Sequence, residues 1–454
     1  MKPNVILFNI DDLGYSDISC YGSKKNETPN IDKLAENGIQ FTNFYASASL
    51  CTPSRAGLMT GTHPKRLDFM EFNLYKRGEV ENPIDAGVLF PGQPEGLRPD
   101  EKTIGNLFKS AGYKTKLVGK WHLGDQEEHS PLNFGFDSFF GLPYSNDMGI
   151  RKEGVGAERL LYTMCPLPVM ENNKIIQEQP DCCALAERLT TEAINFVKDS
   201  KDEPFFLYFA HYYVHNPIYV SSHFLNKSNN DPLGGAVASI DWTIGAINYE
   251  LEKLGLLDNT MIIFMSDNGG NRQSSNFPLK GFKGSQWEGG HRVNCIIQWN
   301  NVIRQPRMFH GITSMVDIFP TFAHLLEVDI NDGIPRDGVS FLNCIFSETE
   351  ESRRDTWIYY NRNKLTAIRV GDFKLHLYTN ELYDLKVDVG EEVNLYSTYP
   401  EIVEKLDFIA QEYRLELGDG ELKGRRCREK GFVQNFKPLT VLDPLKPYIV
   451  AEYD

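Results

Sequence analysis

No apolar run in this 454-residue sequence approaches the roughly 18 residues of a transmembrane helix, so we expect no membrane-spanning segment. An excess of positive charge is missing too, because 62 acidic residues against 47 basic ones give a formal net charge of −15. This balance argues against nucleic acid or an anionic membrane as a partner. An anionic substrate would therefore need positive charge gathered within its own pocket.

Cysteine pairs at zinc-binding spacing are missing as well. None of the eight cysteines stands in a CxxC pair. Setting Cys51 aside leaves seven, an odd number, so at least one more is free or bonded to another chain. The adjacent Cys182 and Cys183 could join a disulfide but need not. Cysteine usage therefore leaves the redox compartment open.

The start of the sequence lacks the apolar core of a signal peptide. Met1-Lys2-Pro3-Asn4 leads directly into a short apolar run at 5–10, which acidic residues follow at once. From this we expect either a cytosolic protein or one from which the signal has been removed.

What is present predicts a globular protein of two domains, with 41% apolar and 24% charged residues. Up to about residue 345, short apolar runs alternate with helical patterns. This alternation predicts an α/β fold, with a parallel or mixed sheet covered by helices on both faces. The predicted strands are 5–10, 116–118, 205–210, 261–265 and 295–299, and the predicted helices are 30–37, 101–112 and 236–254.

After about residue 345 the pattern changes. A charged linker at 348–354 precedes alternating runs at 356–360, 366–370 and 373–378, and a further strand is expected at 381–385. Residues 401–417 have the pattern of one amphipathic helix. We therefore expect a main domain at 1–345. A smaller α+β subdomain at 346–454 should contain an antiparallel sheet, a helix and a tail rich in Lys, Arg and Pro.

Two pairs of oxygen-bearing residues follow predicted strands. Asp11-Asp12 come directly after the strand at 5–10, and Asp267-Asn268 follow the strand at 261–265. Each pair alone is more often a solvated turn. Because functional groups collect at the carboxyl ends of strands in open α/β sheets, the two pairs together could serve one ion. Oxygen ligands favour Ca²⁺ or Mg²⁺ over Zn²⁺, and the spacing does not choose between the first two.

Cys51 opens the pentapeptide CTPSR at 51–55. It could be a thiolate nucleophile whose pKa Arg55 lowers, or a buried apolar cysteine in a loop. For a lone cysteine the buried interpretation is the commoner one.

Further basic side chains follow other predicted strands. Lys120 and His122 stand in GKWHLG after the strand at 116–118, where both can point into one cleft. His215 stands in VHNP after the strand at 205–210, with His211 as a weaker candidate nearby. Lys283 stands in GFKG, shortly before the EGG turn at 288–290. Taken singly, these are typical of structural histidines, a surface lysine and a glycine-rich loop.

Together these segments resemble the type I sulfatases, which depend on formylglycine. CTPSR is similar to that family's signature, and NIDDLGYSD, GKWHLG, the HNP segment and SDNGG occur in the family's order. The resemblance spans roughly residues 3–390 and looks most like the arylsulfatase A and N-acetylgalactosamine-6-sulfatase branch. It implies an alkaline-phosphatase-like mixed sheet sandwiched by helices, with catalysis in residues 1–345.

The resemblance also implies the cofactors and the metal ligands. A formylglycine-generating enzyme would convert Cys51 to formylglycine (3-oxoalanine). Ca²⁺, with Mg²⁺ as the second choice, would be held by Asp11, Asp12, Cys51, Asp267 and Asn268.

Each catalytic residue receives a role from the same resemblance. Lys120 and Lys283 would hold the sulfuryl oxygens, and Asp267 would act as the base. His215 would protonate the leaving oxygen, and His122 would help to release sulfate. Arg55 would orient the nucleophile, and Ser145 in GLPYS would line the substrate pocket.

The activity implied is hydrolysis of a sulfate ester, on a sulfated carbohydrate, with release of inorganic sulfate. A phosphonate or phosphate monoester hydrolase of the same superfold is the alternative, and a non-catalytic glycan-binding relative is a third hypothesis. Family resemblance predicts a periplasmic or secreted protein. Specificity is expected in loops at 67–99, 147–180 and 270–282 and in the tail after 418, with possible sugar contacts from Tyr212, Tyr213, Arg272 and His291.

Overall fold

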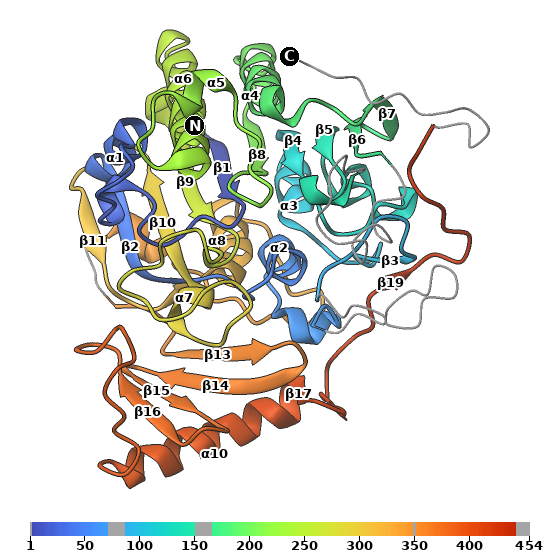
Figure 1. Ribbon diagram of the computed structural model, residues 1–454. Coiled ribbons are helices and arrows are strands. Elements are labelled where there is room, and N and C mark those ends of the chain that lie inside the picture. Colours follow the sequence, from blue (N-terminus) through green and yellow to red (C-terminus); the bar gives the residue numbers. More distant parts are fainter. Residues whose placement is uncertain (1, 71–86, 150–165, 348–350, 442–454) are drawn as a thin grey trace.

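A mixed β-sheet runs through the centre of the molecule (Figure 1). The computed structural model describes residues 2–70, 87–149, 166–347 and 351–441. The middle of the sheet is parallel, in the order β9 (Thr260–Ser266), β1 (Asn4–Ile10), β8 (Phe205–His211), β4 (Lys114–Lys120) and β5 (Ser138–Leu142). The carboxyl ends of these strands therefore meet at one edge of the sheet.

Antiparallel strands extend the sheet on both sides. On one side lie β10 (Arg292–Gln298) and β2 (Gly38–Tyr45), with β11 (Arg307–Phe309) and β12 (Thr313–Ser314) parallel to β2. On the other side lie β6 (Pro168–Glu171) and β7 (Lys174–Glu178).

Both faces of the central strands are buried. In β1, Val5 and Leu7 belong to one hydrophobic core, and Ile6 and Phe8 belong to the other. A strand covered on both faces needs apolar residues at successive positions, which explains the continuous apolar run at 5–10.

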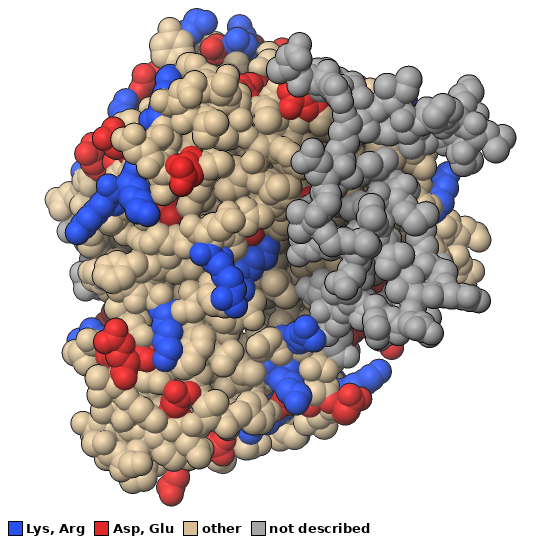
Figure 2. Space-filling model, viewed as in Figure 1, with Lys and Arg blue, Asp and Glu red and all other residues tan. Residues whose placement is uncertain are grey.

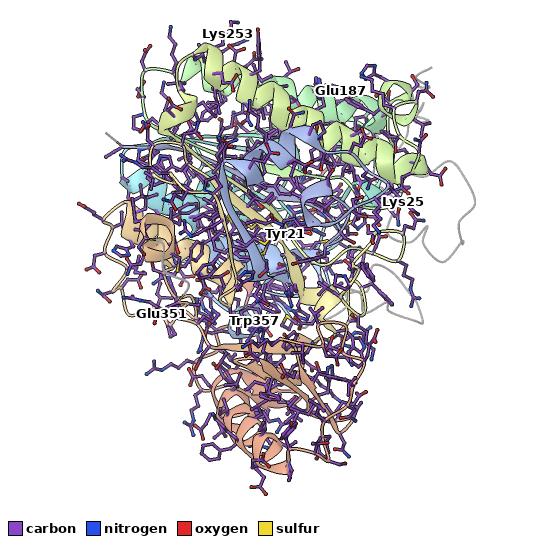
Figure 3. The ribbon with its side chains drawn as sticks, turned by 90° about the vertical axis from the view of Figure 1, so that its left-hand side faces the viewer. Tyr21, Lys25, Glu187, Lys253, Glu351 and Trp357 are labelled. Atoms are coloured by element: carbon purple, nitrogen blue, oxygen red, sulfur yellow. The ribbon has the colours of Figure 1, made fainter. Side chains whose placement is uncertain are left out.

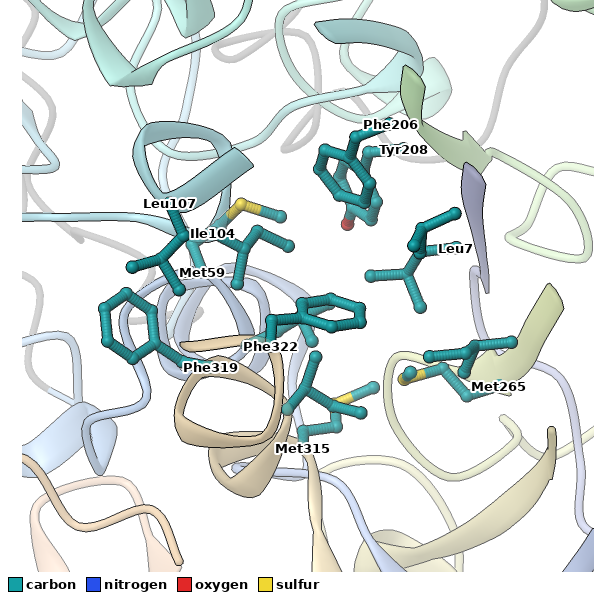
Figure 4. Packing of buried hydrophobic residues seen from close by; sticks show 14 of the residues in the cluster. Leu7, Met59, Ile104, Leu107, Phe206, Tyr208, Met265, Met315, Phe319 and Phe322 are labelled. Atoms are coloured by element: carbon teal, nitrogen blue, oxygen red, sulfur yellow. The ribbon is translucent and has the colours of Figure 1, made fainter. Parts of the chain in front are cut away.

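Helices cover each face. One face carries α1 (Pro29–Glu36), α4 (Cys182–Asp199) and α6 (Asp231–Lys253). The other carries α2 (Cys51–Thr60), α3 (Ile104–Ser110) and α8 (Ile318–Leu325), and Figure 4 shows their side chains packed toward Leu7 and Met265. In the described ranges no helix is long and apolar enough to cross a membrane.

Each strand predicted in the main part of the chain is present, within a few residues of its expected ends. The helix predicted at 236–254 starts earlier, so that Gly234 and Gly235 lie inside α6 rather than before it. A side chain at Gly235 would place its Cβ 3.1 Å from the Leu225 Cα, so glycine permits the close approach of α6 and α5 (Ser222–Leu225).

The C-terminal region contains a separate antiparallel sheet, as predicted. Its order is β13 (Thr356–Asn361), β14 (Lys364–Val370), β15 (Phe373–His376) and β16 (Glu381–Asp384), and α10 (Pro400–Leu417) packs against it. In the side view of Figure 3, Lys253 marks the end of α6 and Trp357 marks this smaller sheet. Part of the predicted linker, 348–350, lies outside the described residues.

A buried polar cluster joins the smaller sheet to the main body. The Glu288 carboxylate accepts hydrogen bonds from Tyr45 and Tyr359, each at 2.6 Å, and lies 3.1 Å from the Lys374 ammonium. Lys374 also lies 2.9 Å from Glu391. Because these groups are buried and paired, they fix the smaller sheet against the loop that carries residues 280–288.

The tail differs from the prediction that it belongs with the C-terminal subdomain. It crosses back to the main body, where β19 (Gly431–Phe432) pairs with β3 (Glu95–Gly96). The Lys437 N–H then donates to the Gln126 side chain over 3.0 Å, and the Val441 N–H donates to Glu178 over 2.8 Å. We therefore propose that the boundary near residue 345 separates the two sheets, and that the tail contacts the main body as well as the C-terminal region.

Candidate active site

The four acidic and thiol side chains predicted to bind a metal lie together at the carboxyl edge of the sheet. One ligand atom from each of Asp11, Asp12, Cys51 and Asp267 lies within 4.8 Å of the others, and all four residues are buried. Strands β1 and β9 are neighbours, so the acid pairs that follow them meet as predicted. Asn268 joins the cluster, because its amide donates to Asp12 over 2.8 Å.

Cys51 is the first residue of α2, rather than part of a loop. Its Sγ lies 3.2 Å from Asp11 Oδ1 and 3.3 Å from Lys283 Nζ. Burial, followed by the nearby Asp11 carboxylate, raises the pKa of the Cys51 thiol well above its usual range. A buried thiol beside a carboxylate is a poor source of thiolate, so this environment favours the interpretation of the unmodified Cys51 as a buried cysteine.

Arg55 contacts the acid cluster around Cys51. It lies one turn along α2 from Cys51, and its Nε and Nη2 reach Asp267 Oδ2 at 3.0 and 2.8 Å. Its Nη1 also donates to the Lys120 carbonyl over 3.0 Å. Arg55 thus fixes Asp267 and the end of β4 relative to α2.

Two lysines supply positive charge beside the acid cluster at Cys51. Lys120 Nζ lies 2.5 Å from Asp11 Oδ2 and 3.3 Å from Ser145 Oγ, and Lys283 Nζ lies 2.8 Å from Asp12 Oδ1. Burial disfavours the charged form of both, but the carboxylates outweigh it, so both lysines have a raised pKa. Both ammonium groups are therefore charged. The positive charge expected for an anionic substrate is local to this site.

His122 is held in one tautomer. Its Nε2 lies 3.0 Å from the Leu89 carbonyl, which can only accept, so Nε2 carries the proton. Its Nδ1 is buried and has no hydrogen-bond partner among the described residues. Burial, with Lys120 and Arg55 nearby, holds the pKa of His122 well below its usual range. His122 is therefore neutral, with Nδ1 available as a proton acceptor.

His215 faces the cluster from the segment after β8. Its Nδ1 donates to the Asn216 carbonyl over 2.7 Å, and its Nε2 lies 3.9 Å from Asp12 Oδ2. Burial and then Lys283 lower the pKa of His215. His211 is different, because it is buried and its Nδ1 accepts the Tyr213 N–H at 3.0 Å.

Two basic side chains of the site are partly exposed in the part of the chain that the structure describes. The Lys283 and His215 side chains keep 17% and 15% of their surface exposed, whereas Lys120 keeps 0%. The scissile group would therefore pass Lys283 and His215 before it meets Lys120.

The residues of the acid cluster fit a divalent cation. Burial, followed by the nearby Asp11, raises the pKa of Asp267 to about 7. The Oδ1 of Asn268 is buried and accepts no hydrogen bond in the described structure. Three buried carboxylates crowded together and an amide oxygen that accepts no hydrogen bond are the groups that a hard cation satisfies.

Three of the four predicted sugar contacts are wrong. Tyr212 and Tyr213 are buried and donate to the carbonyls of Cys182 and Tyr219, and His291 is buried against the Tyr359 ring. Arg272 is exposed, as a substrate contact must be. Parts of two predicted specificity loops, 71–86 and 150–165, lie outside the described residues.

Leu89 and Glu288 are site-shaping residues that sequence reasoning missed. Leu89 acts through its backbone, with its carbonyl on His122 and its N–H donating to Thr52 Oγ1 over 3.2 Å. A contact made by the backbone does not depend on the residue type, so the sequence gives no sign of it. Glu288 stands in the EGG turn that we noted, but its partners Tyr359 and Lys374 are far along the chain.

Comparison with known proteins agrees with this geometry. The sulfatase family model matches residues 3–328. Human arylsulfatase A is 32% identical over 442 residues, covering 87% of this chain and 83% of its own. N-acetylgalactosamine-6-sulfatase of Mus musculus is 33% identical over 395 residues, covering 83% and 72%.

Solved structures show the same alkaline-phosphatase-like fold. The crystal structure of Ps i-CgsB in complex with k-i-k-neocarrahexaose has a TM-score of 0.78 at 29% identity, and covers 91% of this chain and 93% of that one. The family model matches more than half of the chain, and relatives above 30% identity cover more than two thirds of it. The chain therefore belongs to the sulfatase family, and it is a sulfuric ester hydrolase.

Proposed function

We propose that this sulfatase removes sulfate from a sulfated carbohydrate and that Cys51 works after conversion to formylglycine. The observation that carries the proposal is the position of the Cys51 side chain, which is buried in the acid cluster with its Sγ 3.2 Å from Asp11 and 3.3 Å from Lys283. When hydrated, formylglycine supplies two hydroxyls on one carbon, so one can bond to sulfur and the other can later expel sulfate.

In this proposal the lysines bind the sulfuryl oxygens and the histidines transfer protons. Lys283, which lies 3.3 Å from the Cys51 Sγ, and Lys120, which pairs with Asp11, would hold the sulfuryl oxygens, where charge is greatest in the transition state. His215 would give a proton from Nε2 to the leaving alcohol oxygen in its doubly protonated form, because its Nδ1–H already donates to the Asn216 carbonyl. His122, whose Nδ1 has no hydrogen-bond partner among the described residues, would accept a proton from residue 51 when sulfate leaves. Ser145 would steady Lys120 and the bound sulfate.

A resident cation would be held by the acid cluster, and we propose Ca²⁺ ahead of Mg²⁺. The ligands would be Asp11, Asp12, Asp267, Asn268 and residue 51. Buried carboxylates crowded around one point suit Ca²⁺, whereas Mg²⁺ prefers to keep several waters. The ion would add positive charge beside the sulfuryl oxygens.

Removing the cation should lower both activity and thermal stability. Treatment with a chelator is expected to reduce turnover by roughly tenfold or more and to lower the Tm, with Ca²⁺ restoring both better than Mg²⁺. Differential scanning fluorimetry checks the second effect independently of catalysis. The Asp11→Asn variant should lose the Ca²⁺-dependent Tm shift, whereas a variant of the exposed Asp258, Asp258→Asn, should keep it. An unchanged Tm on adding Ca²⁺ to chelated wild type would contradict the assignment.

A carbohydrate substrate is supported by the relatives. Ps i-CgsB was solved with k-i-k-neocarrahexaose, and N-acetylgalactosamine-6-sulfatase is named for a sugar. We propose that the protein is secreted or periplasmic and that a formylglycine-generating enzyme acts on it during maturation.

Comparing matched esters tests the reaction class. The kcat/KM for 4-nitrophenyl sulfate is expected to exceed those for 4-nitrophenyl phosphate and for the corresponding phosphonate monoester by roughly tenfold or more. Sulfate would leave residue 51 as a dianion, which the two lysines and the proposed divalent cation would stabilise. A preference for the phosphonate would instead favour the alternative hydrolase of the same superfold.

A further inference from the structure

Arg272 is an exposed cation beside the open side of the site. Its guanidinium carbon lies 4.1 Å from the centre of the Phe282 ring, and Phe282 directly precedes Lys283. Among the carboxylates that the structure describes, none pairs with Arg272. In a chain of net charge −15, an arginine that stacks on an aromatic ring instead of pairing with an acid needs another explanation.

The loop that carries Arg272 is fixed at both ends. The Gly270 carbonyl accepts the Lys283 N–H at 2.9 Å, which joins the two ends beside the site. The Asn276 side chain accepts the Gly270 N–H at 3.0 Å and donates to the Gly270 carbonyl at 3.0 Å. The Ser275 N–H donates to Asp17 at 2.9 Å. Arg272 is thus presented by a pre-organised loop, which lowers the entropy lost when a ligand binds.

The position of Arg272 lies outside the sulfate-binding centre. Lys283 is partly exposed and contacts Cys51, and Arg272 is exposed on the ring of Phe282, the residue before Lys283. Figure 2 shows Lys and Arg side chains gathered near the middle of the face, where Figure 1 draws the loop before α7 (Glu288–His291). A substrate whose ester sulfate lies on Lys120 and Lys283 would extend past this loop.

The chemistry of arginine selects the ligand. A guanidinium stacked by one face on Phe282 keeps its edge N–H groups free for two parallel hydrogen bonds to one anionic group. We propose that Arg272 binds a second anionic group of the substrate, a sulfate or a carboxylate, so the natural substrate is a polyanionic glycan rather than a sugar with a single sulfate. This inference rests on the proposed function.

The test compares esters that differ only in a second anionic group. Glucosamine 6-O-sulfate is compared with glucosamine 2-N,6-O-disulfate, and a sulfated disaccharide is compared with and without a uronate carboxylate. Wild type is expected to prefer the second anion in at least one pair. In the Arg272→Ala variant the ratio of the two kcat/KM values should fall roughly tenfold, mainly through KM, and Arg272→Lys should recover part of it. The sulfate and carboxylate arms identify which group is recognised.

Controls separate this role from damage to the loop. Arg304→Ala, which removes another exposed arginine, should leave the ratio unchanged. In wild type the preference should weaken as salt is added, and in Arg272→Ala it should be nearly independent of salt. An equal loss on both members of every pair, or no preference in wild type, overturns the inference.

Binding to unconverted protein keeps the inference separate from the proposed function. Isothermal titration of the Cys51 form with the preferred polyanionic glycan should show weaker binding in Arg272→Ala. If wild type hydrolyses no sulfate ester, the proposed function fails, yet this difference in affinity is still measured. Equal affinity of the two proteins would contradict the subsite directly.

Discussion

The Cys51→Ser variant is expected to react once with a sulfate ester and then stop. A serine can form the bond to sulfur, and His215 can protonate the leaving alcohol, so one equivalent of alcohol is released. The serine then carries a stable sulfate ester, because it has no second hydroxyl on the same carbon to expel sulfate. Steady-state turnover should therefore fall by about 10⁴-fold or more.

The measurement combines a burst of alcohol with intact mass. The burst should equal the amount of enzyme, and the protein should gain one sulfo group. A matched control is Cys183→Ser, which changes a half-buried cysteine at the start of α4 and should turn over as wild type. Multiple turnovers by Cys51→Ser, with free sulfate, would show that the second hydroxyl is not required.

Lys120→Ala is expected to cost roughly 10²–10³-fold in kcat. Lys120 is buried at the end of β4, with its ammonium 2.5 Å from Asp11 and 3.3 Å from Ser145. Truncating it removes the positive charge that would meet the sulfuryl oxygens on the inner side of Cys51. It also leaves Asp11 with one fewer cationic neighbour, which further disfavours a sulfate monoanion at that position.

A variant of a second lysine on the same strand provides the kinetic control. Lys114→Ala removes a lysine at the other end of β4, where it pairs with Glu203 on the surface, and should leave kcat unchanged. Far-UV circular dichroism and the Tm establish that both variants are folded. A kcat for Lys120→Ala within about threefold of wild type would contradict the proposed contact with the transition state.

The sequence predicted the acid cluster because its residues follow buried strands. Asp11-Asp12 and Asp267-Asn268 stand after runs that had to be central strands, and parallel neighbours end at the same edge. The position of these residues directly after buried strands was therefore enough to predict that they lie together. Lys120 and His122 were found in the same way, since Lys120 ends β4 and His122 follows two residues later.

Other features depend on contacts that no local pattern records. Cys51 begins a helix whose first turn is stabilised by tertiary contacts, including Ser54 on the Asp267 carbonyl, so a loop seemed equally possible. Tyr212 and Tyr213 follow a strand like the catalytic groups, but their hydroxyls turn into the protein. The returning tail was missed because its partners, including Gln126 and Glu178, lie far earlier in the chain.

Mass spectrometry of the peptide that contains residues 51–55, from protein isolated from its native source, tests the central claim most directly. The account predicts that residue 51 is largely an aldehyde, with –CHO in place of –CH₂SH, and that it reacts with a hydrazide probe. Active protein whose residue 51 is entirely unmodified cysteine would contradict the account.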